Sequence, residues 1–165
     1  AIAMLDELYR SKVVFVVVGG GPWLDDLKEL AKNAGVAMNV RFEGLMPYED
    51  MPKEIAKADC CVCPLPDRPE WNVSSPLKVF EYMACAKPII LTPILAHKDV
   101  FEDEKFIIWT KNYKENGFME AIMYAMDNRD KLRLYAEKGS KIVSQQHDWA
   151  ILGQRFANYL LQTFT

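Results

Sequence analysis

A polar loop passes into a predicted amphipathic helix at Ser75-Pro76-Leu77-Lys78-Val79-Phe80-Glu81-Tyr82-Met83-Ala84, and an apolar run at residues 88–92 follows. Pro76 suits the first position of a helix, where no amide hydrogen is needed. The free amides and the dipole at the start of such a helix favour an anion. The segment therefore predicts a loop, helix and strand unit whose helix can face a negatively charged ligand.

Outward from this segment, short apolar runs alternate with amphipathic ones. Strands are predicted at residues 13–18, 39–43, 59–63, 88–92 and 105–109, and helices at residues 1–12, 23–34, 48–58, 75–84, 116–126, 131–146 and 149–164. Residues 13–18 are all apolar, which is typical of a strand buried on both faces. The alternation predicts one α/β domain over residues 1–165, a three-layer sandwich with a parallel sheet of about five strands and helices on both faces.

Composition excludes several classes of protein. Half of the 165 residues are hydrophobic and 26% are charged, as in an ordinary soluble domain. The net charge is −3 and the cations form no basic run, so we expect no nucleic-acid partner. No apolar run approaches 18 residues and no signal peptide is visible. The first residue is not methionine, and we expect an excised domain or a mature fragment.

The cysteines indicate neither a disulfide framework nor a zinc site. Cys60, Cys61 and Cys63 fall inside one predicted strand, and Cys85 stands apart from them. A zinc site would usually show pairs two residues apart with histidines. We therefore expect buried, reduced thiols, which suit a cytoplasmic protein, and no bound metal.

The predicted strand ends place several loops on one edge of the sheet. These loops are residues 19–22, 44–47, 64–75 and 92–98. Open parallel sheets bind ligands beyond the carboxyl ends of their strands. This edge is therefore the expected position of a ligand.

Each motif on this edge allows a binding role and a purely structural one. The turn Gly19-Gly20-Gly21-Pro22 could bring backbone close to a phosphate or a sugar, or could simply be a tight turn. It lacks the full glycine spacing of dinucleotide-binding proteins. Phe42-Glu43-Gly44-Leu45-Met46-Pro47 alone is an ordinary strand-to-helix turn.

The segment around Ser75 offers more chemistry. Ser74 or Ser75 could cap the helix or donate to a phosphate, and the amides of Leu77 and Lys78 could point at an anion. The alternative is a capped surface helix with a solvated lysine. Glu81 could accept hydrogen bonds from both hydroxyls of a ribose, or could be a solvated glutamate near the helix start.

Two further side chains on these loops have open roles. Trp71 could stack on a base or sugar, although a lone tryptophan in a proline-rich loop more often covers the core. His97 follows the fourth predicted strand and is a candidate proton donor.

Several segments in register resemble a known family. They are Val16-Val17-Val18-Gly19-Gly20-Gly21-Pro22, Val40-Arg41-Phe42-Glu43-Gly44, Ala58-Asp59-Cys60-Cys61-Val62-Cys63-Pro64, the segment 75–84, and Lys87-Pro88. Their order and spacing resemble the C-terminal, Rossmann-like domain of family 4 glycosyltransferases with the GT-B fold, over nearly the whole chain.

The resemblance implies a role for each matching position. Gly20 and Gly21 would border the phosphates of a nucleotide-sugar donor, and the backbone around Leu45 and Met46 would meet the base. Ser74, Ser75, Pro76, Leu77 and Lys78 would hold the diphosphate, and Glu81 would bind the ribose. The resemblance also implies sugar transfer with retention of anomeric configuration and without a metal.

The chain departs from the family pattern at three places. Val73 stands where a second glutamate often contacts the donor sugar. Ala86 replaces the glycine usual before the strand proline, and Thr92-Pro93-Ile94-Leu95 replaces a glycine pair. The N-terminal domain and the first strand of this domain, with an arginine and a lysine for the diphosphate, are absent from the sequence. The catalytic residues are therefore unknown, and we expect this part alone to be inactive.

The sequence thus predicts the donor-binding domain of a retaining glycosyltransferase that transfers a sugar to a glycan or lipid-linked acceptor. We expect the full-length enzyme to be cytoplasmic and to touch the inner face of a membrane only peripherally. Two alternatives are a GT-B nucleotide-sugar epimerase and a degenerate domain that binds nucleotide-sugar weakly or serves as a scaffold. Val73 favours the degenerate domain.

Overall fold

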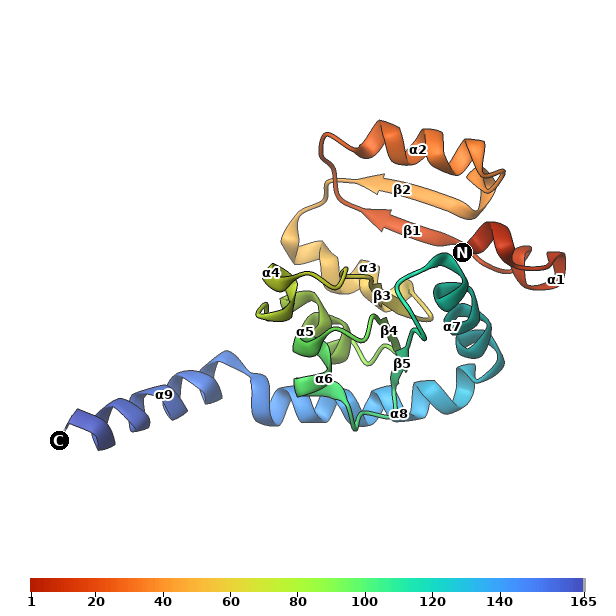
Figure 1. The fold of residues 1–165 in the computed structure, drawn as a ribbon. Helices are drawn as coiled ribbons and strands as arrows, with labels where there is room; N and C mark the ends of the chain where they lie inside the picture. Colours follow the sequence, from red (N-terminus) through yellow and green to blue (C-terminus); the bar gives the residue numbers. More distant parts are fainter. Residues whose placement is uncertain (165) are drawn as a thin grey trace.

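The computed structural model describes residues 1–164 as an α/β fold (Figure 1). Its strands and helices are, in chain order, α1 (Glu7–Arg10), β1 (Phe15–Val18), α2 (Leu24–Asn33), β2 (Val40–Gly44), α3 (Met51–Lys57), β3 (Cys61–Cys63), α4 (Pro69–Asn72), α5 (Leu77–Ala84), β4 (Ile89–Leu91), α6 (Leu95–Phe101), β5 (Ile107–Trp109), α7 (Glu115–Asp127), α8 (Arg129–Ile142) and α9 (Trp149–Phe164). Short 3₁₀ turns form at Ile2–Met4, Ala37–Asn39 and Tyr48–Asp50, and a π-helical turn at Val143–His147 joins α8 to α9.

The five expected strands are present and parallel, but they form two sheets instead of one. β1 pairs with β2, with Phe15 opposite Val40. β4 lies between β3 and β5, with Ile89 opposite both Cys61 and Ile107. β1 and β3 are both edge strands, and in residues 1–164 no strand pairs with both of them.

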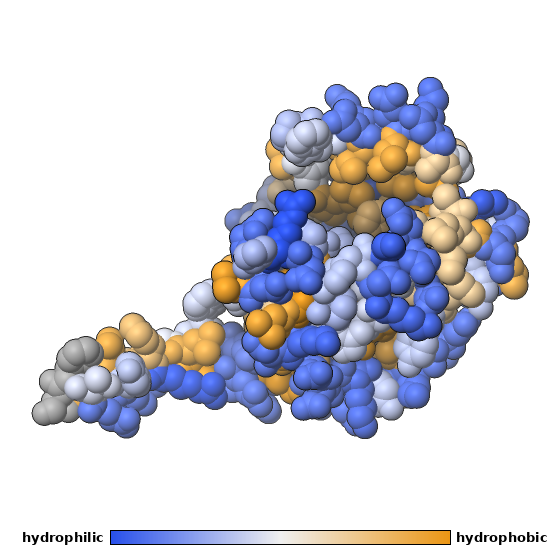
Figure 2. Space-filling model, in the orientation of Figure 1, coloured by the Kyte–Doolittle hydropathy of each residue, from blue (hydrophilic) through white to orange (hydrophobic). Residues whose placement is uncertain are grey.

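The prediction that residues 13–18 are buried on both faces is wrong in this structure. Val14 is 57% exposed and Phe15 is 41% exposed. β1 belongs to a sheet of only two strands, and its residues are exposed or half-buried throughout. Figure 2 shows the consequence, an apolar surface over β1 and β2 beside a hollow that separates them from the rest of the chain.

The three-stranded sheet carries the core and is covered on both faces, which confirms the three-layer prediction for this part. Ile89 and Leu91 face a cluster that α5, α6 and α8 complete, including Val79, Phe101 and Ala136. Ile90 and Ile108 face the other way, toward residues of α7 and α8. Successive residues of a strand point to opposite faces, so a wholly apolar β4 fits a sheet buried on both sides.

Several helix predictions need correction. Residues 1–12 form two short pieces instead of one helix, and α4 and α6 lie within stretches predicted to be loops. The helix predicted to end at residue 146 ends at Ile142. The last helix begins and ends as predicted and projects from the body of the chain (Figure 1). Among the described residues, no helix is both long and apolar enough to cross a membrane.

The end of α5 has a Schellman geometry with an unusual residue in it. The amide of Lys87 donates to the Tyr82 carbonyl at 3.0 Å, and the amide of Ala86 donates to the Met83 carbonyl at 2.9 Å. Ala86 has a φ of +53°, the left-handed region that glycine normally occupies at this position. The chain therefore keeps the cap of the family pattern but places a methyl group in it.

We expect Ala86→Gly to stabilise the fold. An alanine in the left-handed region costs about 1–2 kcal/mol, and glycine removes that cost but adds entropy to the unfolded chain. The net gain should be about 0.5–1 kcal/mol in the free energy of unfolding, measured by urea denaturation. Ala84→Gly, at the last residue of the same helix, is the control and should destabilise by up to about 1 kcal/mol. Loss of stability in Ala86→Gly would contradict the assignment of strain.

Candidate functional site

The start of α5 is open, although not in the way the sequence suggests. Pro76 is the N-cap residue and not the first helical residue, and no side chain caps the helix. Neither serine caps the helix, and the Ser74 hydroxyl donates instead to the Trp71 carbonyl at 2.8 Å. The free amides of Leu77 and Lys78 therefore begin the helix without a side-chain acceptor, an arrangement that suits an anion.

Lys78 adds a positive charge beside the carboxyl end of β3. Its side chain is exposed, and its charge opposes the burial that raises the pKa of the Cys63 thiol. Cys63 is the last residue of β3. A lysine at this place can pair with an anion that lies over the start of α5.

The glycine loop after β1 meets the turn after β2. Gly19 and Gly21 have φ values of +133° and +141°, which side chains rarely adopt. The Gly19 amide donates to the Gly44 carbonyl at 2.7 Å. A Cβ added to Gly20 would lie 3.2 Å from Cγ of Leu45, so the loop and the turn are in contact. The structure thus brings together three predicted residues, Gly20, Gly21 and Leu45, with Met46 next to them.

The turn after β2 also reaches α5. The hydroxyl of Tyr48 donates to Oε1 of Glu81 at 3.2 Å, and this hydrogen bond with Glu81 raises the pKa of Tyr48. Tyr48 is 71% exposed, and Glu81 is half-buried. Sequence analysis missed Tyr48. The available signal was an aromatic residue directly after the predicted edge loop 44–47, at the start of the helix predicted at residues 48–58.

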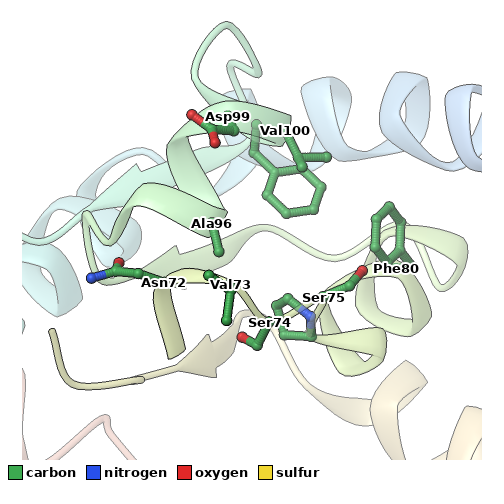
Figure 3. Close-up of a pocket in the computed structure, with 10 residues that line it drawn as sticks. Asn72, Val73, Ser74, Ser75, Phe80, Ala96, Asp99 and Val100 are labelled. Carbon is green, nitrogen blue, oxygen red and sulfur yellow. The ribbon is translucent and has the colours of Figure 1, made fainter. Parts of the chain in front are cut away.

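A separate hollow of about 240 Å³ lies between the loop before α5 and helix α6 (Figure 3). Its lining residues are Asn72, Val73, Ser74, Ser75, Pro76, Phe80, Ala96, Asp99, Val100 and Phe101. Of the predicted site residues, only the two serines and Pro76 line it. Val73 is 87% exposed at this hollow, and Asn72 accepts a hydrogen bond from the Leu95 amide at 2.9 Å.

His97 is not an exposed proton donor. It is fully buried, and its Nδ1–H donates to the Thr92 carbonyl at 2.7 Å. Its Nε2 lies 3.8 Å from Sγ of Cys63. Burial lowers the pKa of His97, so the neutral ring is favoured. Trp71 is 38% exposed in α4, and a stacking role for it stays a prediction.

The cysteines are free thiols, as predicted. Burial raises the pKa of Cys60 and of Cys61 to about 12, so these thiols are poor nucleophiles at neutral pH. Within residues 1–164, no group of three histidine, cysteine or acidic side chains could hold a metal ion. The site therefore has amides, hydroxyls, a lysine and a carboxylate as its chemical groups.

The family comparison agrees with this arrangement. A family model described as "Glycosyl transferases group 1" matches residues 1–142, and the chain belongs to this family. The chain is 26% identical over 147 residues to a GDP-mannose-dependent alpha-(1-6)-phosphatidylinositol monomannoside mannosyltransferase of Mycobacterium tuberculosis. The match covers 88% of this chain and 38% of that protein, so the chain spans about two-fifths of that relative's length. A protein of the same description from Mycolicibacterium smegmatis is 33% identical over 93 residues, covering 54% of this chain and 24% of its own length.

Solved structures confirm the fold class. HepE of Anabaena in complex with UDP gives a TM-score of 0.75 at 20% identity, covering 98% of this chain and 43% of that one. Sucrose-phosphate synthase of Thermosynechococcus elongatus gives 0.77 at 19% identity, covering 90% of this chain and 38% of that one. The fold is that of the C-terminal Rossmann-like domain of GT-B glycosyltransferases.

Proposed function

We propose that this chain binds the nucleotide-sugar donor within a longer, two-domain glycosyltransferase. The observation that carries the proposal is the meeting of the loop after β1, the turn after β2 and helix α5. Gly20 lies against Leu45, and the same turn reaches α5 through Tyr48 and Glu81. Ligands of open α/β sheets bind beyond the carboxyl ends of the strands, which is where this loop and this turn lie. Membership of the group 1 glycosyl transferases supports the choice of ligand.

In this proposal the diphosphate lies over the start of α5. The amides of Leu77 and Lys78 donate to its oxygens, and the Lys78 ammonium offsets part of its charge. When the bond from the sugar to the diphosphate breaks, negative charge grows on the leaving diphosphate. Groups that are already oriented toward this charge stabilise it without reorganisation. No metal is needed in this scheme.

The nucleoside would extend from α5 toward the turn after β2. Glu81 accepts hydrogen bonds from the ribose hydroxyls, and backbone groups at Leu45 and Met46 meet the base. Leu45 is 86% exposed, so an apolar side chain is available beside the base. The base is proposed to be guanine or uracil, because the mycobacterial relatives are named as GDP-mannose-dependent and HepE was solved with UDP.

The acceptor and the catalytic residues are proposed to lie in the rest of the longer enzyme. The mycobacterial relatives are named as phosphatidylinositol monomannoside mannosyltransferases, which supports a glycan or lipid-linked acceptor. The longer enzyme is proposed to touch the cytoplasmic face of a membrane only peripherally. The transfer is proposed to retain the anomeric configuration.

A degenerate binding domain is the second candidate, and one observation favours it. Val73 presents an exposed apolar side chain where the family pattern has a glutamate for the donor sugar. Such a domain would bind the nucleotide, and the attached sugar would add nothing to its affinity. Comparing GDP with GDP-mannose, and UDP with UDP-glucose, separates the two candidates.

The test is the thermal stability of the 165-residue chain in the presence of GDP, UDP, ADP and the two nucleotide-sugars. A ligand at ten times its Kd should add about 1.4 kcal/mol to the free energy of unfolding. For a domain of this size, that corresponds to a rise in Tm of about 3–6 °C. We expect Tm to rise with the nucleotides of one base, and we expect this rise to be lost in Glu81→Ala. Glu29→Ala, an exposed glutamate of α2, is the control. No rise with any nucleotide at millimolar concentration would refute the proposal for this chain.

A further inference from the structure

We propose that Tyr48 is a positioning residue for the nucleoside: its hydroxyl holds Oε1 of Glu81, so that the other carboxylate oxygen faces the ribose. The inference rests on the proposed donor site and adds a residue to it that the family pattern does not indicate. It starts from one contact, the 3.2 Å hydrogen bond between side chains 33 residues apart.

The contact belongs to a segment that is tied to α5 at several points. Sγ of Cys85 lies 3.9 Å from the Pro52 carbonyl, and Nζ of Lys87 donates to the Ala56 carbonyl at 2.6 Å. Tyr48, Pro52 and Ala56 lie in the turn after β2 and in helix α3. Three contacts in sequence order therefore hold this segment beside α5 and the residues that directly follow it. The position of the Tyr48 ring relative to Glu81 is therefore supported by the packing of the whole segment and not by this one hydrogen bond alone.

The chemistry of the pair suits a ribose. A carboxylate has two oxygens and can accept about four hydrogen bonds, and Tyr48 uses one of them. Glu81 is half-buried in a helix, and a free glutamate there would lose rotamer freedom when it bound a ligand. Tyr48 restricts the carboxylate before the ligand arrives. The ligand then meets a pre-organised acceptor for both of its ribose hydroxyls.

The opposite role is also testable. Tyr48 could compete with the ribose for Glu81 and so weaken binding. In that case, removal of the hydroxyl would strengthen binding. Tyr48→Phe separates the two roles because it removes only the hydroxyl. The ring is exposed, so the substitution should leave the stability of the fold unchanged.

The experiment is isothermal titration of the 165-residue chain with GDP and UDP and with 2′-deoxy-GDP and 2′-deoxy-UDP. The variants are Tyr48→Phe, Glu81→Gln and the double variant. We expect Tyr48→Phe to weaken the preferred ribonucleotide about threefold to tenfold, and the deoxynucleotide by a smaller factor. In the double variant, the two effects should not multiply, because Tyr48 acts through Glu81.

Tyr9→Phe is the matched control. Its hydroxyl donates to the carboxylate of Asp127 at 2.9 Å, so it has the same kind of bond on α1 and α7. This variant should bind like the wild type. If the wild-type chain binds GDP or UDP and Tyr48→Phe binds equally or more tightly, the positioning role is wrong and the proposed function stands. If the wild-type chain binds neither, the proposed function fails and this inference fails with it.

Discussion

Gly139→Ala is expected to lower the free energy of unfolding by about 2 kcal/mol. Gly139 lies near the end of α8, which covers the three-stranded sheet, and it is buried against Phe106. A Cβ at this position would lie 2.5 Å from Cε1 and 2.7 Å from Cζ of the Phe106 ring. The ring is 2% exposed within the core cluster, so it has little room to move. Overpacking of this kind costs about 1–3 kcal/mol.

The matched control is the same substitution in the next helix. Gly153 lies in α9, and a Cβ there would meet no atom within 4 Å. Gly153→Ala should therefore leave stability unchanged or raise it by up to about 1 kcal/mol through helix propensity. Both are measured by urea denaturation. In Gly139→Ala, a second change of Phe106→Leu should recover part of the loss. Equal losses in the two single variants would contradict an origin in the Phe106 contact.

The two glycines show where sequence analysis stops. Both stand in strongly periodic helical segments, and nothing local distinguishes them. The difference comes from Phe106, which is 33 residues away from Gly139 in sequence and reaches it only because β5 and α8 pack together. Periodicity reports which face of a helix is apolar, but it does not report which side chain occupies the space opposite a given residue.

The strands illustrate the same limit at the level of the sheet. The apolar runs at residues 13–18 and 88–92 look alike, and both contain a strand as predicted. Yet β4 is completely buried, because it has a strand on each side and helices on both faces, whereas β1 is an exposed edge strand. Hydrophobicity predicts the existence of a strand, and its burial depends on the neighbours that the chain supplies.

At the site, the structure shows contacts among some of the predicted residues but does not test their roles. Gly20 lies against Leu45, and Glu81, in α5, accepts a hydrogen bond from Tyr48. The capping role of Ser74 and Ser75 is wrong, because capping depends on where the chain turns and not on residue type alone. The sequence did not indicate a role for Tyr48, because its partner, Glu81, is distant in sequence. The binding roles of these residues stay predictions.

Mild acid is expected to destabilise the fold through His97. Its Nδ1–H is held by the Thr92 carbonyl, and its Nε2 faces the Cys63 thiol in a fully buried position. Burial lowers the pKa of His97 below its usual value of about 6.5. Below that value, the unfolded chain takes up a proton that the folded chain resists. The effect of His97 on the free energy of unfolding is therefore absent above about pH 6.5. Below that pH, the free energy of unfolding falls by up to about 1.4 kcal/mol per pH unit until the pH reaches the pKa of His97 in the folded chain.

His97→Asn tests the assignment. The asparagine amide can still donate to the Thr92 carbonyl, but it does not take up a proton in mild acid. Asparagine is smaller than histidine, and the space it leaves should make the variant less stable than the wild type at pH 7.5. Its free energy of unfolding should then decline less between pH 6.5 and 5, and the gap to the wild type should narrow. Burial also raises the pKa of Glu104, which acts in the opposite direction as the pH falls, so the comparison must be between variants at each pH. Parallel declines for wild type and variant would show that His97 is not the responsible group.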